Sequence, residues 1–240
     1  PKGANDTMER NIPDFPPQSC LFPGVIFDLD GTLLDSMDVW SRVDKEFLAD
    51  YGIAVPPDYM EACGAMSFLE TAEYTIARFS LPAKPEELME RWLEMAREEY
   101  ALHVSFKPGA AELLQKLHRC GVRLAVATAS RREHFLPCLE RHGILSLFDE
   151  LATTDDAGCG KNSPDIFHLT ASWLGLSPSD CAVFEDTLPA AKSALAAGCV
   201  PFGVWEKHSE NAKPEMQRIC RGYFSSLLDA CSSPLLWKEG

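Results

Sequence analysis

The sequence lacks several patterns that would each have assigned it to a class of protein. No apolar run reaches the ~20 residues that a membrane-spanning helix needs, and the N-terminal segment has no signal-peptide core. The nine cysteines contain no CxxC pair, and the six histidines lack the HExxH spacing of zinc hydrolases. We therefore expect a cytoplasmic protein with reduced thiols, no membrane partner, and neither a zinc site nor a disulfide framework.

Basic side chains are scarce relative to acidic ones. The chain has 22 lysines and arginines against 36 aspartates and glutamates, a formal net charge of -14. This charge disfavours nucleic acid and anionic membranes as partners, and an anionic substrate would need local positive charge from a metal ion or a few basic residues. The 240 residues, 46% hydrophobic and 24% charged, are typical of an ordinary globular protein with one domain and an insertion, or with two modest domains.

What the sequence does contain is a short strand-forming run that leads directly into carboxylates. Val25, Ile26 and Phe27 are followed by Asp28 and Asp30, and a glycine comes next. A short apolar run before a turn predicts a buried strand, and open α/β sheets bind ligands where their strands end. The Asp-Gly dipeptide is equally typical of a tight hairpin turn. By itself, this stretch leaves chemistry and a simple turn both open.

The rest of the pattern divides the chain into segments of different character. Residues 1–23 are rich in proline and polar residues and predict a loosely ordered leader. Residues 37–105 show helical periodicity throughout, which predicts a compact helical unit. Residues 24–36 and 106–240 alternate strands with helices. The predicted fold class is therefore α/β, a Rossmann-like parallel sheet with a helical unit inserted after the first strand.

The apolar spacing and the positions of Gly and Pro also predict individual elements. In the α/β part we expect helices over 110–120, 132–142, 164–174 and 188–197, and strands over 122–128, 150–153, 181–184 and 200–204. We expect residues 211–230 to finish with one helix and a short extended piece. The buried stripes predicted in the helical part are Val39, Val43, Phe47 and Leu48; Phe68, Ala72, Ile76 and Phe79; and Leu88, Trp92, Met95 and Tyr100.

Residues that could take part in catalysis or binding follow four of the predicted strands. They are Asp28 and Asp30; Thr128, Ala129 and Ser130; Asp155 and Asp156, followed by Lys161; and Glu185, Asp186 and Thr187. Each group is ordinary by itself, because Asp-Thr before a helix is a common N-cap and a single lysine is a common surface residue. The carboxyl ends of parallel strands open onto one edge of the sheet, so we expect these groups to meet there.

The order of these motifs resembles the haloacid dehalogenase superfamily of phosphotransferases. The resemblance covers about residues 24–204 and points to the branch with a helical cap, which includes sugar-phosphate phosphatases and β-phosphoglucomutase. It implies a nucleophilic Asp28, an acid/base Asp30, and a phosphate site made by Thr128, Ala129 and Lys161. It further implies a Mg²⁺ site formed by Asp28, the main-chain carbonyl of Asp30, Glu185 and Asp186.

The chemistry of these residue types agrees with what the resemblance implies. A carboxylate can accept a phosphoryl group, and the aspartyl-phosphate splits one hard step into two. Like charges repel when Asp28 approaches a phosphate, and Mg²⁺ and Lys161 would offset this repulsion. Asp30 would protonate the leaving alkoxide and later take a proton from the attacking water. The predicted function is Mg²⁺-dependent hydrolysis of a small phosphomonoester, with a sugar phosphate as the first candidate.

Two alternative functions stay open at this point. The first is a phosphomutase of the β-phosphoglucomutase type, which carries a histidine after the first motif and a cap arginine for a second phosphate. Trp40 and Phe68 stand near those positions here, and neither can pair with a phosphate, although both are also typical of a helical core. The second is a non-catalytic phosphoacceptor or binding module, against which Asp30, Lys161 and a whole cap argue.

Three positions depart from the family's usual pattern. Asn162 stands where proline is usual, and Ala190 and Ser193 replace a glycine and an alanine. None of these changes removes a charged catalytic group, so they affect the shape of two loops and not the predicted chemistry. The partner that we expect is a small phosphorylated metabolite; its identity, the oligomeric state and a role for the leader do not follow from the sequence.

Overall fold

The computed structural model describes residues 19–63, 66 and 68–238, so most of the predicted leader lies outside the described residues. Within this range the chain forms two compact units. The α/β unit contains the chain up to Ser36, Ser105–Arg132 and everything from Leu139 onward. The helical unit contains Met37–Val104 and, in addition, Glu133–Cys138 from the middle of a later helix.

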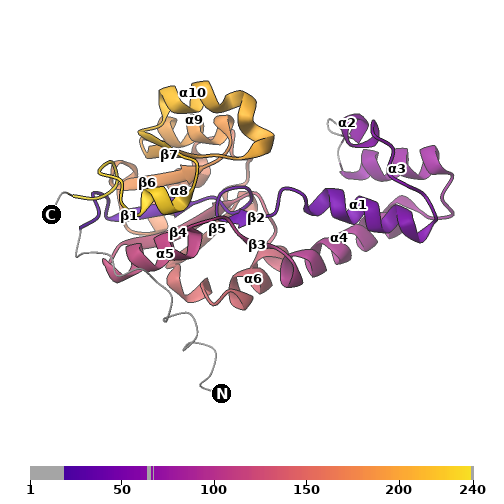
Figure 1. The fold of residues 1–240 in the computed structure, drawn as a ribbon, viewed down its shortest axis with the longest axis horizontal. Helices are drawn as coiled ribbons and strands as arrows, with labels where there is room; N and C mark the ends of the chain where they lie inside the picture. Colours follow the sequence, from indigo (N-terminus) through magenta and orange to yellow (C-terminus); the bar gives the residue numbers. More distant parts are fainter. Residues whose placement is uncertain (1–18, 64–65, 67, 239–240) are drawn as a thin grey trace, which may run out of the picture. The chain divides into compact units, whose positions relative to one another are not determined.

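The α/β unit is built on a six-stranded sheet in which all paired strands are parallel, in the order β5-β4-β1-β6-β7-β8 (Figure 1). Its strands are β1 (Gly24–Phe27), β4 (Arg123–Thr128), β5 (Glu150–Thr153), β6 (Cys181–Glu185), β7 (Val200–Val204) and β8 (Gly222–Phe224). Every residue of β1 and β6 is buried, as expected for strands covered on both faces. The predicted fold class, an α/β Rossmann-like parallel sheet, is confirmed.

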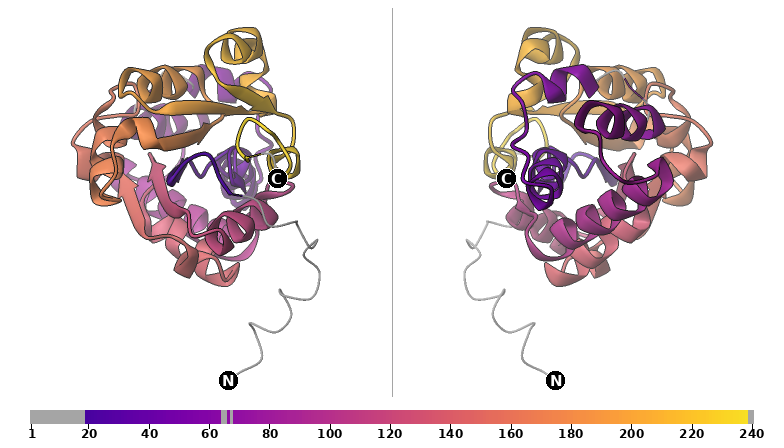
Figure 2. Two further views of the ribbon diagram at one scale, coloured as in Figure 1. Left: turned by 90° about the vertical axis from the view of Figure 1, so that its left-hand side faces the viewer. Right: turned by 90° about the vertical axis from the view of Figure 1, so that its right-hand side faces the viewer.

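Helices flank this sheet on both sides (Figure 2). They are α5 (Ala110–Arg119), α7 (Thr154–Ala157), α8 (Asp165–Trp173), α9 (Leu188–Ala196), α10 (Lys213–Ile219) and α11 (Leu227–Ala230). Helix α6 (Arg132–Arg141) begins in this unit, but most of its residues belong to the helical unit. Short 3-10 turns lie at Leu145–Leu147, Pro178–Asp180 and Lys207–Ala212. Four helices match their predicted ranges closely, whereas the chain end contains two helices and the sixth strand instead of one helix and an extended piece. The apolar pattern there is too short to separate a strand from a loop.

A conformational requirement explains the glycine that precedes α5. Gly109 has φ +84°, a left-handed conformation that suits glycine. A Cβ at this position would fall 2.0 Å from the backbone nitrogen of Leu228. The C-terminal helix α11 therefore approaches α5 as closely as it does because position 109 has no side chain.

The helical unit consists of α1 (Val39–Asp50), α2 (Tyr59–Cys63), α3 (Phe68–Phe79) and α4 (Pro85–Leu102). Helices α1 and α3 both pack against α4, whose Trp92 ring contacts those of Phe47 and Phe68. The predicted stripes of α1 and α4 are buried. Of the predicted stripe of α3 only Ala72 is fully buried; the other three residues are half-buried, and the second buried residue of this helix is Thr75, outside the stripe.

The interpretation of Trp40 as a core residue is wrong. Its side chain is 38% exposed, and its ring meets the half-buried Phe68 edge-on, with 5.6 Å between the ring centroids. Helical spacing alone does not distinguish a core aromatic from one at the border of the core, because both fall on the same face of the helix.

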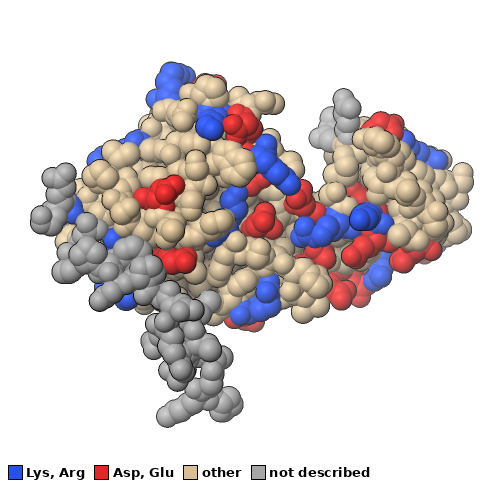
Figure 3. Space-filling model, in the orientation of Figure 1, with Lys and Arg blue, Asp and Glu red and all other residues tan. Residues whose placement is uncertain are grey.

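Two short strands link the two units along the chain. They are β2 (Leu34–Asp35), just before the helical unit, and β3 (Ser105–Phe106), just after it, and they pair in antiparallel fashion. We call this pair the linker ribbon. None of the described helices is long and apolar enough to cross a membrane. Acidic and basic side chains are interspersed on the face of the molecule that Figure 3 shows.

The carboxyl group of Asp44, in α1, should make the stability of the folded protein depend on pH. Burial raises the pKa of the half-buried Asp44 to about 6, above the ordinary value of 3.8 that applies to the unfolded chain. The folded state thus favours the protonated form, and this contribution to stability is lost as the pH rises through about 6. We expect Asp44→Asn to stabilise the protein by about 3 kcal/mol near pH 8 and by less than about 1 kcal/mol near pH 4.

Urea unfolding at several pH values measures this difference. Asp50→Asn, at the exposed end of the same helix, is the matched control and should shift the midpoint near pH 8 by much less than Asp44→Asn does. An Asp44→Asn advantage that does not grow with pH would contradict the prediction.

Candidate active site

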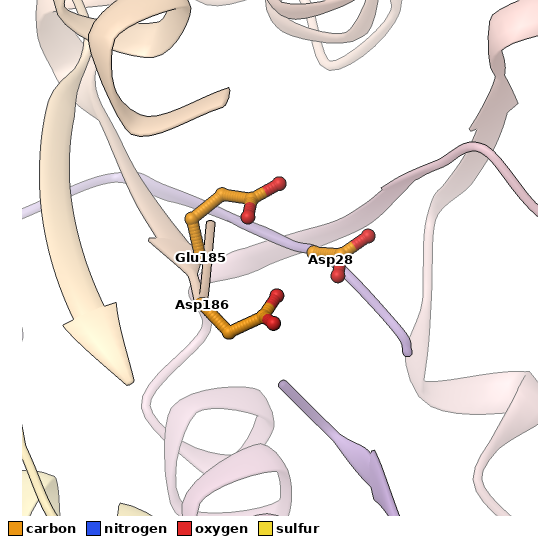
Figure 4. A group of neighbouring side chains, drawn as sticks. All are labelled: Asp28, Glu185 and Asp186. Atoms are coloured by element: carbon orange, nitrogen blue, oxygen red, sulfur yellow. The ribbon is translucent and has the colours of Figure 1, made fainter. Parts of the chain in front are cut away.

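Three carboxylates meet where the central strands β1 and β6 end. Phe27 pairs with Phe184 in the sheet, and the N–H of Asp28 donates to the carbonyl of Phe184 at 3.0 Å. This register places Asp28 beside the end of β6, whose last residue is Glu185 and which Asp186 follows directly. The three side chains are 7%, 1% and 2% exposed, respectively, and one oxygen from each lies within 4.8 Å of the others. In Figure 4 the side chains of Glu185 and Asp186 extend toward the side on which Asp28 lies.

Lys161 supplies the positive charge that these carboxylates need. Its Nζ donates to Asp28 Oδ1 at 2.7 Å and forms an ion pair with Glu185. The lysine side chain is 12% exposed, so the contact is screened little by water. A residue that looks like a common surface lysine in the sequence is thus buried beside the predicted nucleophile.

Burial and neighbouring charges perturb these groups strongly. Burial raises the pKa of Asp28 to about 7, although the Lys161 ammonium acts in the opposite direction. Burial, followed by the Glu185 and Asp28 carboxylates, raises the pKa of Asp186 to about 9. Burial lowers the pKa of Lys161, but its two carboxylate partners outweigh this effect and hold it above the usual range. One ammonium group therefore does not neutralise the cluster.

Asp30 is held by two serine hydroxyls from different parts of the chain. Ser36 Oγ donates to Asp30 Oδ1 at 2.6 Å, and Ser130 Oγ donates to Oδ2. Backbone contacts in the same loop add to this, because Gly31 N–H donates to the Leu34 carbonyl at 2.9 Å. Asp30 lies in the loop that follows β1, but this loop is not the tight hairpin turn of the alternative interpretation, because β1 pairs in parallel with β4 and β6.

The predicted phosphate residues lie at the end of β4, the neighbour of β1. Thr128 is fully buried, and its Oγ1 accepts from the Ser130 N–H at 3.0 Å. Ala129 lies between them, at a position where only its backbone could hold a ligand. The Ser130–Asp30 hydrogen bond joins this loop to the β1 loop. The structure therefore brings together the predicted residues of three strand ends and Lys161.

The fourth strand end does not join the cluster. Asp155 is exposed, and Asp156 accepts from Thr153 and pairs with Arg132 at 2.9 Å. These bonds lower the pKa of Asp156 to about 2, chiefly through Arg132. The Asp156 carboxylate thus caps α7 and ties it to the start of α6.

The structure gives three hydroxyl residues contacts that the sequence did not predict. Ser36 and Ser130 hold Asp30, and the hydroxyl of Thr32 donates to Asp186 Oδ1 at 3.3 Å. Ser130 is among the residues at the predicted strand ends and Thr32 lies in the first family motif, whereas Ser36, six residues after Asp30, has no spacing that would single it out. Their roles depend on where the loop after β1 folds back.

The donor set fits a divalent cation bound by hard oxygen ligands. Asp186 Oδ2 is buried and has no hydrogen-bond partner among the described residues, which is costly for a polar atom unless a ligand completes it. All three clustered side chains offer carboxylate oxygens, the ligand type that Mg²⁺ prefers. A divalent cation would also relieve the repulsion that raises the pKa of Asp186.

Comparison with known proteins identifies the family to which this chain belongs. The family model for haloacid dehalogenase-like hydrolases matches residues 22–198. The chain belongs to this family, which confirms the resemblance drawn from its motifs.

Individual proteins that are similar to this chain include two phosphatases and a solved structure with the same fold. The chain is 30% identical to a probable pseudouridine-5'-phosphatase of Saccharomyces cerevisiae, over 77% of this chain and 82% of that protein. It is 29% identical to hexitol phosphatase A of Escherichia coli, over 73% of this chain and 80% of that protein. A solved structure of a candidate β-phosphoglucomutase from Thermotoga maritima has the same fold, with a TM-score of 0.78, 22% identity, and coverage of 87% of this chain and 96% of that chain.

Proposed function

We propose that this protein is a Mg²⁺-dependent phosphoric monoester hydrolase that acts on a small phosphorylated metabolite in the cytoplasm. Membership of the hydrolase family and the phosphatases among the relatives support the reaction class. The observation that carries the proposal is the buried cluster itself. Asp28 is positioned by Lys161 at 2.7 Å and lies beside an acidic pair with an unpartnered carboxylate oxygen.

The chemistry proceeds in two steps on the side chain of Asp28. A carboxylate oxygen of Asp28 attacks the phosphorus atom, and the bond between phosphorus and the leaving oxygen breaks. Asp30 donates a proton to the leaving alkoxide, which departs as an alcohol. In the second step a water molecule attacks the phosphoryl group on Asp28, Asp30 takes a proton from that water, and inorganic phosphate leaves with the Asp28 carboxylate restored.

The other residues stabilise charge and hold the phosphate in place. Lys161 faces Asp28 and would screen the negative charge that builds up on the phosphoryl oxygens. Thr128 and the backbone N–H groups that follow it would hold another phosphate oxygen. Mg²⁺ bound by Asp28, Asp186 and the carbonyl of Asp30, with Glu185 beside them, would polarise the phosphate and offset its repulsion by Asp28.

The helical unit argues for a phosphatase over a mutase. A mutase must also bind a second phosphate, and Trp40 and Phe68 offer no charge where that branch carries histidine and arginine. A phosphorylated sugar or polyol is the substrate class that we propose to test first, because the similar proteins include a hexitol phosphatase. The likeness to the β-phosphoglucomutase structure supports the fold alone.

Product analysis tests this proposal directly. We expect the wild-type protein with Mg²⁺ to release inorganic phosphate from 4-nitrophenyl phosphate and from members of a panel of sugar, polyol and nucleoside monophosphates. No bisphosphate activator should be needed, and phosphate should form in a one-to-one ratio with the alcohol. Sugar-phosphate isomers without free phosphate would instead identify a mutase. A single phosphorylation of Asp28 without turnover would identify a phosphoacceptor module.

A further inference from the structure

The α/β unit contains a buried ion pair that the proposed chemistry does not use. Lys107 Nζ donates to Glu206 Oε2 at 2.5 Å and to the main-chain carbonyl of Trp205 at 3.0 Å. Lys107 is 9% exposed and Glu206 only 3%. His208 Nδ1 lies 3.0 Å from the second carboxylate oxygen, Oε1, so both oxygens have a partner.

The charges of this pair hold each other in place. Burial raises the pKa of Glu206, but the hydrogen bonds from Lys107 and His208 outweigh that effect and hold it below its usual range. A buried ion pair adds little net stability, because desolvation of both charges offsets their attraction. Its geometry is nevertheless strict, since a displaced partner would leave the other charge buried and unpaired. The pair is therefore better suited to fixing a position than to stabilising the fold.

The pair sits at the base of the linker ribbon. Lys107 comes directly after β3, and its backbone N–H donates to the carbonyl of Leu33 at 2.9 Å. Phe106 pairs with Leu34 in the ribbon. Glu206 follows β7, which is two strands away from β1 in the sheet. The side chain of Lys107 thus ties the end of β3 to the segment that follows β7, and its backbone N–H ties the same point to Leu33, just before β2.

The same ribbon carries the groups that orient Asp30. Leu34 accepts from the Gly31 N–H and forms an isolated bridge with Asp30. Ser36, the first residue after β2, donates its hydroxyl to Asp30 at 2.6 Å. A short and continuous set of contacts therefore runs from Glu206 through Lys107 and the ribbon to the acid/base carboxylate.

We propose that Lys107 and Glu206 are positioning residues for Asp30: by fixing the linker ribbon to the sheet, they hold the acid/base carboxylate in line with the leaving group. This inference rests on the proposed phosphatase function. Loss of the pair should impair proton donation to the leaving group and should leave attack by Asp28 intact.

Leaving-group dependence tests this claim. An alkyl phosphate needs a proton on its leaving oxygen, whereas 4-nitrophenolate leaves with little help. General acid catalysis contributes about 10²–10⁴-fold, so a displaced Asp30 should forfeit part of that factor. We expect Lys107→Met to lower kcat/KM for an alkyl phosphate by at least about tenfold and for 4-nitrophenyl phosphate by less than about twofold. Because kcat/KM covers only steps up to departure of the alcohol, later hydrolysis of Asp28-phosphate does not mask the difference.

A matched control and a second variant keep the test decisive. Lys116 is also buried, donates to the Cys231 carbonyl at 2.6 Å and lies 3.9 Å from the Trp237 ring centroid, and both of these partners belong to the C-terminal segment. Lys116→Met should not change the ratio between the two substrates. The double variant Lys107→Met/Glu206→Gln leaves no unpaired charge and serves if Lys107→Met fails to fold. Asp30→Asn, which lacks the acid/base carboxylate, sets the largest selective loss of kcat/KM that is expected for the alkyl phosphate.

The outcomes separate this inference from the proposed function. Selective loss on the alkyl phosphate in both Lys107 variants, absent in Lys116→Met, supports the positioning role. Equal losses on both substrates, no loss at all, or the same selectivity in Lys116→Met overturns it while the phosphatase function stands. A wild-type protein that releases no phosphate, or an Asp28→Asn variant that releases it as fast as the wild type, overturns the proposed function and this inference with it.

Discussion

Replacing Asp28 by asparagine should abolish phosphate release while leaving the protein folded. An amide lacks the nucleophilic oxygen that attacks phosphorus, and losses on the order of 10⁴-fold or more are usual when a nucleophile is removed. Burial and the neighbouring carboxylates already raise the pKa of Asp28 to about 7, so a neutral amide is readily accommodated there. We therefore expect the melting temperature to stay the same or to rise. Steady-state phosphate release and thermal unfolding measure the two effects.

Asp155→Asn is the matched control for this experiment. Asp155 follows β5 at the same edge of the sheet but is exposed and outside the carboxylate cluster. Its substitution should change phosphate release by less than about twofold, as for most surface changes. Wild-type protein quenched in acid during turnover should carry a phosphoryl group on the peptide that contains Asp28. Activity of Asp28→Asn close to that of the wild type, with deamidation excluded by mass spectrometry, would disprove the mechanism.

Withdrawal of divalent cations should produce the second large effect. We expect EDTA to reduce phosphate release by at least about a thousandfold, because the phosphate would then meet Asp28 without the cation that offsets their repulsion. Added Mg²⁺ should restore the activity of the wild type. In Asp186→Asn, which lacks one of the three clustered carboxylates, Mg²⁺ should restore little of it.

Binding can be measured without any substrate. A ligand that binds only the folded state at a hundred times its Kd stabilises the protein by about 2.7 kcal/mol, so Mg²⁺ should raise the melting temperature of the wild type. Asp186→Asn should lose this shift, and Asp155→Asn should keep it. Full activity in EDTA would contradict the proposed metal dependence, and an equal Mg²⁺ shift in Asp186→Asn would place the ion elsewhere.

Several elements of the fold could be predicted because their signals are local. The run Val25–Phe27 is apolar without interruption, and only a strand buried on both faces tolerates such a run next to charged residues. The helices that end near Gly121, Gly143 and Gly175 were delimited by residues with positive φ, which the structure shows at all three positions. The sixth strand, Gly222–Phe224, has only three residues, and it pairs with β7, the strand before it in the chain. Nothing local distinguishes it from a loop.

The residues of the candidate site also divide into those with a local sequence signal and those without one. Asp28, Asp30, Lys161, Glu185 and Asp186 could be predicted because the strand pattern and the family motifs point to them. The hydrogen bonds that Thr32, Ser36 and Ser130 make to these carboxylates could not, since a hydroxyl group becomes part of a site only when the chain folds it against a particular carboxylate. Trp40 shows the converse case, in which helical spacing favoured the core and the structure placed the ring at its border.

The sequence by itself determined the class of fold, the family, and the residue types available at the strand ends, because periodicity and motif order are properties of neighbouring residues. Only the tertiary structure decided which of those residues meet. The parallel register of β1 with β6 brings Asp28 to Glu185 and Asp186, and burial then turns ordinary side chains into groups with shifted pKa values. It also decided that Lys107 and Glu206, which are 99 residues apart, form a buried pair at the base of the linker ribbon. Pairing and burial depend on contacts between distant segments, and no local pattern encodes them.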